Sequence, residues 1–586
     1  MKKLAIVLAV ILAVLLVVAL VLTFLAKDAL DNPRQDPSDV IMQTLPITEA
    51  PTQTPTDAPT EAPTQAPTEA PTEAPTEAPT EAPTEPPYTA VSMADSDPAN
   101  WEVEWDVVVN GEIAESYTRQ EQILFEDTSY FAFPGVASFR GGNYRQDASY
   151  GTAEVSSESI DLIWSKSVGY VEKPEWGGCC WTGQPLVVQW DAETRAIMNL
   201  YDEKKEKEDL VEVIYAKADG YVHFFDIEDG SATRDPLYIG MAFKGSGAID
   251  PRGYPILYVG AGLNRGNAVQ RIYIVSLIDG STLYSRSGYE PLAPRSWCAF
   301  DGAPLVDAET DTLIWGGENG VLYTFKLNTQ YDKTAGTLTM EPEEPVMTRY
   351  SDSYKEDGRA SGYESSVTAV ENYLYIGDNS GMLQCIDANT MQVVWVQDMV
   401  DDINATPLFE WGEDGNGYIY SGPSMDYSGF STDIPISRID ARTGEVQWTH
   451  TMEAINGNDV PGGVLASPML GREGTDLEDL VIFAVGRSPN IWKGQVVAFN
   501  KETGEVVWQF ETYSYMWSSP VGIYTEDGKG YIFQADASGR CYLLDGATGK
   551  QVDMLNLERT VEASPVVFGD RVVLGSRSSM YIFDID

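Results

Sequence analysis

Basic residues are scarce in this sequence of 586 residues, and their shortage narrows the set of partners. The chain has 38 lysines and arginines against 89 aspartates and glutamates, so its formal net charge is −51. Nucleic acid is not expected as a partner, because neutralising phosphates requires clustered Lys and Arg. The acidic composition indicates either solubility outside the cell or attraction of cations and basic partners.

Histidine and cysteine are also rare. With only His223 and His450, a histidine metal site or a Ser-His-Asp centre is not expected, and both are predicted to be ordinary strand residues. Five cysteines are too few and too scattered for a disulfide framework in a chain of this length. Packing must therefore hold the fold together.

A long uncharged run stands near the N-terminus. Residues 4–26 are 23 residues without a charge, and at about 1.5 Å each they span a hydrocarbon core roughly 30 Å thick. This length favours an uncleaved signal anchor, with cleavage after Leu25-Ala26 as the alternative. Lys2 and Lys3 place the N-terminus in the cytoplasm and the rest of the chain outside. We therefore expect a single-pass protein of the cell membrane.

A proline-rich segment follows the predicted anchor. Residues 46–87 repeat Pro, Thr, Glu and Ala, as in "PTEAPTEAPTEAPTEAPT", and cannot pack a core. Frequent proline predicts a disordered, extended spacer that reaches on the order of 130 Å. The chain then divides into a cytoplasmic lysine tip with its anchor (1–27), a stalk (28–87), a small β accessory with an entry segment (88–157) and a large domain (158–586).

A recurring phrase predicts the architecture of the large domain. The stretch "YLYIGDNSGMLQCIDANTMQVVW", residues 373–395, reads as three short apolar runs separated by turns. Similar phrases end at Trp448, Trp508 and Met554. Pairs of a small residue and proline precede the repeats at spacings of 61, 52 and 45 residues: Thr406-Pro407, Ser467-Pro468, Ser519-Pro520 and Ser564-Pro565. These spacings suit four-stranded propeller blades with variable loops.

The turn and the tryptophan of each phrase have physical roles. In the turn from Asp440 to Gly444, the Asp side chain can accept hydrogen bonds from the backbone, and the glycine tolerates a positive φ. Trp448 follows on the next strand, where a large indole can cover the seam with a neighbouring blade. A single blade leaves both faces of its sheet exposed, so each blade needs the next.

At these residues the sequence resembles the pyrroloquinoline-quinone-like (PQQ-like) propeller repeat family, whose phrase is roughly Asp-x-x-Thr-Gly-x-x-x-Trp. The resemblance covers roughly residues 139–586. The residues predicted to dock one blade on another are Asp387, Thr390, Trp395, Asp440, Thr443, Gly444, Trp448, Asn500, Thr503, Gly504, Trp508, Asp545, Thr548, Gly549 and Trp164. Three positions depart from the phrase: Met391 replaces the Gly, Asn500 replaces the Asp, and Asp553 stands where Trp is expected.

The two ends of the large domain complement one another. Seven full repeats are followed by a fragment that stops before its Trp strand, while residues 160–165 form a lone Trp strand before the first repeat. Pairing the two removes open sheet edges and completes an eighth blade. The fold class is therefore all-β, an eight-bladed propeller. Upstream, "FRGGNYRQDAS" resembles the entry segment of the family's propellers, and Asn110-Gly111 predicts a two-residue hairpin.

The adjacent pair Cys179-Cys180, flanked by Trp176 and Trp181, is the sharpest oddity. In quinone-dependent alcohol dehydrogenases of this family a vicinal cystine lies beside the cofactor, so the resemblance implies a candidate vicinal disulfide. The family's calcium-binding Glu and Asn and its catalytic Asp do not map onto this sequence, and no Cys-x-x-Cys-His haem motif is present. A structural pair is favoured, and no catalytic residue is assigned.

Calcium and quinone stay as alternatives rather than expected cofactors. The acidic stretches "GEDGNGYIY", "AETDT" and "TEDGKG" are similar to oxygen-rich calcium loops, but hairpin turn chemistry explains them equally well. The favoured function is a non-catalytic, membrane-anchored extracellular module, monomeric, that binds or scaffolds a protein or a glycan. A quinone-dependent dehydrogenase is the alternative, and an envelope assembly factor is a weaker one.

Overall fold

The computed structural model describes residues 88–126, 129–168, 183–263, 268–352, 361–457 and 460–586. The chain separates into two compact units, Met1–Thr84 and Glu85–Asp586, and the description below concerns the second. The predicted anchor, the stalk and the pair Cys179-Cys180 lie outside the described residues. In the part of the chain that is described, no helix has the length and apolar character needed to cross a membrane.

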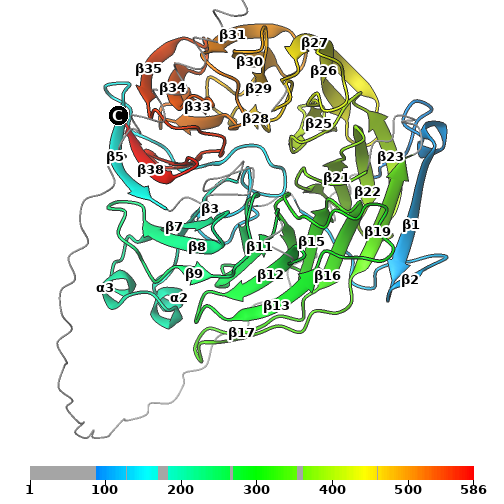
Figure 1. Cartoon of the computed structure of the whole chain (residues 1–586), viewed down its shortest axis with the longest axis horizontal. Coiled ribbons are helices and arrows are strands. Elements are labelled where there is room, and N and C mark those ends of the chain that lie inside the picture. Colours follow the sequence, from blue (N-terminus) through cyan, green and yellow to red (C-terminus); the bar gives the residue numbers. More distant parts are fainter. Residues whose placement is uncertain (1–87, 127–128, 169–182, 264–267, 353–360, 458–459) are drawn as a thin grey trace, which may run out of the picture. The chain divides into compact units, whose positions relative to one another are not determined.

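Eight sheets follow one another around a ring, which confirms the predicted eight-bladed, all-β propeller (Figure 1). Their strands pair antiparallel, except β4 with β36. Blades 1 and 2 consist of β3 (Gly135–Val136), β6 (Leu186–Gln189), β7 (Val211–Ala216), β8 (Tyr221–Asp226) and β9 (Leu237–Tyr238), then β10 (Ala248–Ile249), β11 (Ile256–Gly260), β12 (Arg271–Ser276) and β13 (Thr282–Ser287). Blades 3 and 4 consist of β14 (Leu305–Asp307), β15 (Thr312–Gly317), β16 (Val321–Lys326), β19 (Val346–Asp352), β1 (Val103–Val109) and β2 (Glu112–Ile113), then β20 (Thr368–Val370), β21 (Tyr373–Gly377), β22 (Met382–Asp387) and β23 (Gln392–Asp398).

The second half of the ring is more regular. Blades 5 and 6 consist of β24 (Leu408–Trp411), β25 (Gly417–Ser421), β26 (Ser431–Asp440) and β27 (Val446–Ile455), then β28 (Met469–Leu470), β29 (Leu480–Gly486), β30 (Gly494–Asn500) and β31 (Val506–Thr512). Blades 7 and 8 consist of β32 (Val521–Tyr524), β33 (Gly530–Ala535), β34 (Arg540–Asp545) and β35 (Gln551–Asn556), then β4 (Ser149–Tyr150), β36 (Val566–Phe568), β37 (Arg571–Gly575), β38 (Ser579–Ile585) and β5 (Ile160–Ser167).

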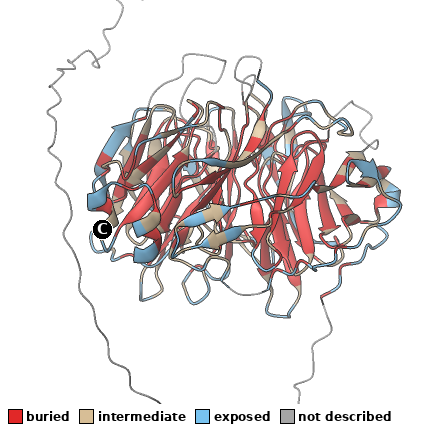
Figure 2. Cartoon of the chain, turned by 90° about the horizontal axis from the view of Figure 1, so that it is seen from below, coloured by how far each residue is buried: buried red, intermediate tan, exposed pale blue. Residues whose placement is uncertain are grey.

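A few elements lie outside this pattern. The hairpin of β17 (Gln330–Asp332) and β18 (Thr337–Thr339) forms a separate two-stranded sheet between β16 and β19. The short helices are η1 (Pro98–Trp101), α2 (Ala192–Ile197) and α3 (Asp202–Lys205). The inner strands of the blades, which pack against neighbouring blades, are buried. Exposed residues concentrate on the outer strands and in the loops (Figure 2).

The eighth blade joins the two ends of the propeller. The C-terminal strand β38 pairs antiparallel with β5, so that Ile582 lies opposite Trp164 and Tyr581 opposite Ser165 (Figure 1). The last repeat therefore obtains its Trp strand from the beginning of the domain, as the two incomplete phrases predict. Closure covers the edge of β38, which would otherwise be open to another chain.

The upstream hairpin is part of a blade rather than a free-standing element. Asn110 and Gly111 have φ of 53° and 77°, which suits a two-residue hairpin turn between β1 and β2. Strand β1 pairs along β19, with Trp105 opposite Tyr350. Blade 3 therefore carries two extra strands on its outer side.

Each repeat tryptophan docks on the turn of the next blade. The indole nitrogen of Trp395 donates to the Ala441 carbonyl at 3.0 Å, that of Trp448 to Lys501 at 2.9 Å, and that of Trp508 to Gly546 at 2.8 Å. Trp164 makes the same bond, to the Ile227 carbonyl at 2.9 Å. In every case the acceptor directly follows the Asp or Asn of the turn. The repeat phrase thus encodes one contact between neighbours.

The capping side chains lie where the phrase predicts them. Oδ1 of Asp440 accepts from the Arg442 and Thr443 amides at 2.8 and 2.9 Å. The other capping acceptors are Asp387 with Asn389 and Thr390, Asn500 with Glu502 and Thr503, and Asp545 with Thr548. Asn500 replaces Asp without loss, because an amide oxygen accepts the same two bonds.

A segment at residues 134–150, here called the belt, runs past the inner strand of every blade. Its contacts follow the ring in order: Val136 with Val187, Ala137 O with Ile249 N, Arg145 with Pro304 O, Asn143 O with Ala369 N, Tyr144 O with Phe409 N, Gln146 O with Leu470 N, Asp147 with Gly522 N, and Ala148 O with Val567 N. The belt contains the predicted entry segment and ties all eight blades together near the axis.

Candidate functional site

The inner strands begin at a ring of hydroxyl groups around the axis, here called the hydroxyl ring. The Thr406 amide donates to Oγ of Ser467 at 2.8 Å, Ser467 to Ser519 at 3.1 Å, and Ser519 to Ser564 at 3.2 Å. Ser366 continues the series with a bond to Thr406 Oγ1 at 2.9 Å. Each hydroxyl of the series therefore accepts a hydrogen bond from the amide at the same position of the preceding blade.

Arg140 of the belt is buried close to this ring. Its guanidinium donates to the carbonyls of Pro520 and Pro468 at 2.7 and 2.9 Å, and the side chain is fully buried. On the other side of the ring a cavity of about 50 Å³ opens among the loops that lead into the inner strands. We call this end of the axis the channel mouth.

Side chains reach the mouth from one repeated position, two residues before the small residue that leads into each inner strand. These residues are Lys244, Asp301, Glu364, Asn404, Leu465 and Trp517, which stand before Ser246, Ala303, Ser366, Thr406, Ser467 and Ser519. Because the ring places the small residues around one axis, the preceding side chains converge on the cavity. Lys244 is the only cation among the described residues that line it.

Three carboxylates gather at the mouth. Asp301, Glu318 and Glu364 each offer an oxygen, and these oxygens lie within 4.8 Å of one another. Glu318 follows β15, and Asp301 and Glu364 come from the loops before β14 and β20. Lys244 forms an ion pair with Asp301. A Cβ on Gly262 would stand 2.1 Å from Asp301 Oδ1, so the backbone approaches this carboxylate too closely for any larger residue.

The carboxylates of this acidic cluster lie close enough to repel one another. Glu318 is 1% exposed and its Oε1 makes no hydrogen bond. Burial, then Glu364 and Asp301, raise the pKa of Glu318 well above its usual range, and Lys244 only partly opposes them. Burial lowers the pKa of Lys244, but Asp301, Glu364 and Glu318 outweigh it and raise that pKa overall. The cluster has more negative charge than its one lysine neutralises.

Acidic groups continue into the next blade. Asp402 is buried, and both its carboxylate oxygens accept from Asn379 Nδ2, at 3.2 and 3.3 Å. Burial and the nearby Asp426 and Glu364 raise the pKa of Asp402 well above its usual range. The mouth therefore offers carboxylates in two linked groups, a setting that attracts a cation.

The described residues that line the mouth fit a hard cation, and the mouth does not fit pyrroloquinoline quinone. The quinone is a rigid three-ring molecule with three carboxylates, and a cavity of about 50 Å³ is far below the roughly 300–1,000 Å³ of small-molecule sites. Its carboxylates would also meet Asp301, Glu318 and Glu364. Calcium instead takes oxygen ligands of the kind these three residues supply.

The acidic turns singled out as calcium loops make turn hydrogen bonds. Asp414 Oδ1 accepts from the Asn416 amide at 3.0 Å and Oδ2 from Tyr418 at 2.7 Å, and Asp527 accepts from Thr525. Within the residues that the structure describes, none of these turns brings three His, Cys, Asp or Glu ligand atoms within metal-binding reach, whereas the mouth does.

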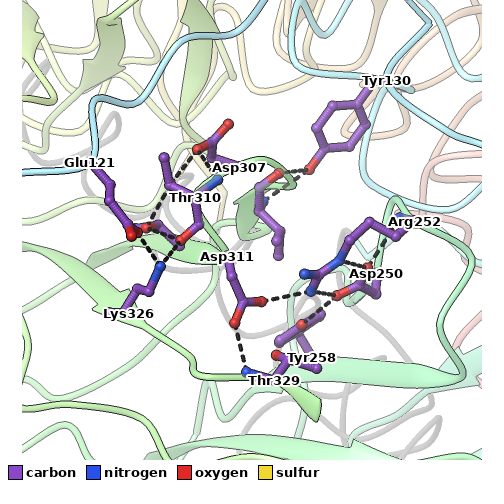
Figure 3. A network of polar contacts seen from close by, with 12 residues as sticks. Glu121, Tyr130, Asp250, Arg252, Tyr258, Asp307, Thr310, Asp311, Lys326 and Thr329 are labelled. Carbon is purple, nitrogen blue, oxygen red and sulfur yellow. Dashed lines mark hydrogen bonds and ion pairs between the residues drawn. The ribbon is translucent and has the colours of Figure 1, made fainter. Parts of the chain in front are cut away.

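The stretch "AETDT" belongs to a structural network between blades 2 and 3 (Figure 3). Arg252 bridges Asp250 at 2.7 Å and Asp311 at 2.8 Å, and Asp311 also accepts from the Thr329 amide at 2.6 Å. Lys326 pairs with Glu121 and donates to the Thr310 carbonyl at 2.7 Å, which fastens the N-terminal segment to this blade. These carboxylates already have cationic partners.

Sequence reasoning assigned no residue of the acidic cluster. Asp301, Glu318 and Glu364 are separated by 17 and 46 residues and carry no motif. Asp301 and Glu364 each lie two residues before the small residue that leads into an inner strand. This repeated position is the sequence signal that could have identified them. The predicted docking residues lie on the blades, and Cys179 and Cys180 lie outside the described residues.

The comparisons with known proteins agree with the fold. A family model described as outer membrane protein assembly factor BamB matches residues 304–472 and 492–586. The quinohemoprotein alcohol dehydrogenase of Comamonas testosteroni is similar over 77% of this chain and 80% of its own, at 14% identity and a TM-score of 0.52. Quinohemoprotein alcohol dehydrogenase ADHIIG of Pseudomonas putida HK5 gives the same coverage, 13% identity and a TM-score of 0.53.

One curated relative is similar in sequence over a short stretch. The beta-alanine-activating enzyme of Danio rerio is 30% identical over 98 residues, which are 16% of this chain and 8% of that protein. At these identities the solved structures show the shared fold alone, and the short match covers a small part of the curated relative.

Proposed function

We propose that this eight-bladed propeller, in which residues 304–472 and 492–586 match a family model described as outer membrane protein assembly factor BamB, is a non-catalytic binding module whose channel mouth holds a divalent cation. One observation supports this proposal most directly. Carboxylate oxygens of Asp301, Glu318 and Glu364 lie close together, and Oε1 of Glu318 makes no hydrogen bond. The cation offsets the repulsion among the three carboxylates, and any further ligand of the module docks on the surrounding loops.

The quinone dehydrogenase alternative has weaker support. Neighbouring structures are named as quinohemoprotein alcohol dehydrogenases, but their likeness concerns the fold. The small cavity and the acidic lining oppose a tricarboxylate cofactor. The family model's description supports an assembly role no more strongly than a general binding role.

Membrane attachment and an extracellular position are part of the same proposal. They rest on the uncharged residues 4–26 and on the proline-rich repeat at 46–87. A stalk of this kind would hold a binding domain clear of the membrane. The ligand class expected from this position is a protein or a glycan of the cell envelope.

Calcium binding to the full chain tests the proposal. We expect calorimetry to detect one site, and Glu318→Gln to weaken it roughly tenfold or more, since one carboxylate ligand is lost. Glu505→Gln is the matched control, because it removes one exposed carboxylate from the turn between β30 and β31, outside the acidic cluster and outside the candidate calcium stretches. Equal affinity in both variants, or no binding at all, would contradict the cation site.

The pH dependence of binding has a definite sign. Burial and neighbouring carboxylates raise the pKa of Glu318, so the group holds its proton to higher pH than an ordinary glutamate. A cation must displace that proton, and we expect affinity to rise with pH through the raised pKa. The increase in melting temperature on adding calcium should likewise be larger at pH 8 than at pH 5. Quinone-dependent turnover of an alcohol with added quinone and calcium would instead support the dehydrogenase.

A further inference from the structure

A second, larger hollow lies at the far end of the axis from the mouth. Strands β24, β28 and β32 start at the hydroxyl ring and end at turns that contain or adjoin Trp411, Arg472 and Tyr524. Between these turns and the belt there is a hollow of about 830 Å³, here called the belt hollow. Its volume falls within the roughly 300–1,000 Å³ typical of small-molecule sites.

Aromatic side chains form much of its lining. They are Tyr130, Phe131, Phe133, Tyr144, Tyr150, Trp411 and Tyr524. The indole nitrogen of Trp411 donates to the Tyr144 hydroxyl at 3.0 Å, which fixes both rings where the belt meets β24. Tyr150 is 40% exposed and stacks on Phe568 at 5.2 Å. Tyr144 and Trp411 are half-buried and Tyr524 is buried, so the rings that a ligand can reach are those of the belt and of β24.

The polar groups of the hollow include both donors and acceptors without hydrogen bonds. Nε of Arg140, Oδ2 of Asp147 and Oε2 of Glu410 make none, and Arg140 and Glu410 are 0% and 1% exposed. Lys501 Nζ lies 3.5 Å from Glu410 Oε2 and forms an ion pair with it. This oxygen nevertheless makes no hydrogen bond, so it can still accept one. Buried groups of this kind favour a ligand that both gives and takes hydrogen bonds.

The charges of the lining argue against a charged ligand. Arg140, Arg145, Arg472 and Lys501 stand among six carboxylates: Asp147, Glu410, Glu413, Glu473, Glu478 and Asp479. A strongly anionic or cationic molecule would meet like charges as well as opposite ones. Hydroxyl groups donate and accept equally, and the C–H faces of sugar rings pack on aromatic rings.

We propose that the belt hollow binds a neutral oligosaccharide. Trp411 and Tyr144 provide a stacking face for one sugar ring. Glu410, on the opposite face of β24, and Asp147 accept from hydroxyls of other rings of the same oligosaccharide. This site is separate from the acidic cluster, because it lies at the other end of the inner strands and shares no residue with Asp301, Glu318 or Glu364. Its test therefore does not depend on the cation site.

Tryptophan fluorescence and calorimetry on the full chain test this proposal. The probes are neutral di- to tetrasaccharides, with a hexuronate oligosaccharide and a lysine-rich peptide as charged comparisons. We expect at least one neutral saccharide to bind, and Trp411→Ala to weaken it tenfold or more, with Trp411→Phe restoring part of the affinity. Trp492→Ala is the matched control, since Trp492 is 75% exposed in the loop between β29 and β30 and does not line the belt hollow.

Each outcome decides the proposal. Binding of no neutral saccharide, preference for either charged probe, or equal loss in the Trp411 and Trp492 variants would overturn it. If Trp411→Ala does not fold, Glu410→Gln provides the second variant: it keeps the side-chain size and should weaken the saccharide three- to tenfold without changing calcium affinity. An unchanged saccharide affinity in a folded Glu410→Gln protein would also count against the site.

Discussion

At the scale of residues, glycine occurs where a tryptophan of the preceding blade presses on a turn. A Cβ on Gly504 would lie 2.6 Å from the Trp448 ring, and one on Gly549 would lie 2.4 Å from Trp508. Both glycines also have positive φ, 71° and 68°. Two constraints therefore act on one position, backbone conformation and space, and they can be separated by experiment.

We predict that Gly504→Ala destabilises the protein more than Gly415→Ala. Gly415 has a similar φ of 75°, but nothing lies within 4 Å of the place that a Cβ would take. Both changes incur the cost of left-handed backbone, about 1–2 kcal/mol, and only the first forces an indole to move, which adds about 1–3 kcal/mol. Thermal or urea unfolding measures the difference. Equal losses would show that the indole contact contributes nothing.

The exception to this pairing explains a departure in the repeat phrase. Met391 replaces the glycine in blade 4 and still has a positive φ of 59°. The fourth strand of blade 3, β19, has no tryptophan, and Nε of Arg119 donates to the Ala388 carbonyl at 3.3 Å where an indole would bond. Thr348 Oγ1 also donates to the Met391 carbonyl at 2.7 Å. Without an indole over the turn, a buried side chain can occupy the space.

At the scale of elements, strand β5 and the belt hold the ring closed. Strand β5 pairs with β38 over seven residue positions, from Ile160↔Ile585 to Ser167↔Ser579. The belt then crosses the inner strands of all eight blades. Both elements precede the first full repeat in sequence, so the folded ring depends on segments that lie far from their partners along the chain.

Removal of residues 160–165 should open the last blade. We expect a sharply lower melting temperature and aggregation, because β38 then exposes an unpaired edge. The control replaces the hairpin of β17 and β18, which forms its own two-stranded sheet, with a short Gly-Ser loop. Light scattering and calorimetry compare the two. A deletion as stable and monomeric as the parent would contradict closure through β5.

At the scale of the whole molecule, the order of the segments along the chain and their charges are relevant to the cellular location of the protein. The uncharged residues 4–26 and the repeats at 46–87 precede a domain whose described mouth is acidic. We propose an extracellular position for such a domain, where divalent cations are plentiful and negative charge maintains solubility.

Protease treatment of intact cells tests this orientation. We predict that the propeller is released and a small N-terminal stub remains with the cells, since an extended proline-rich stalk is accessible to cleavage. Immunoblotting against both ends of the chain follows the products, and a cytoplasmic marker protein controls for lysis. Protection of the large domain in unbroken cells would show that the orientation is wrong.

The repeat phrase was sufficient to predict the blades because its interactions are local or between immediate neighbours. A turn capped by Asp440, a glycine with positive φ and an indole four residues later define one unit, and the unit recurs along the chain. The count of eight followed from two incomplete phrases that complement one another. Residues such as Arg119 escaped prediction, because their partners belong to a different part of the ring.

The sequence by itself determined the all-β propeller and its closure, since period, turn chemistry and the missing Trp strand are all readable along the chain. Only the tertiary structure decided the sites. Asp301, Glu318 and Glu364 belong to three separate loops and meet because the ring turns each loop toward one axis. The belt hollow likewise exists only where residues 134–150 cross the ends of β24, β28 and β32. Residues that meet only when the ring closes are far apart in sequence and share no local sequence pattern. Their contacts can therefore be identified only in the complete ring.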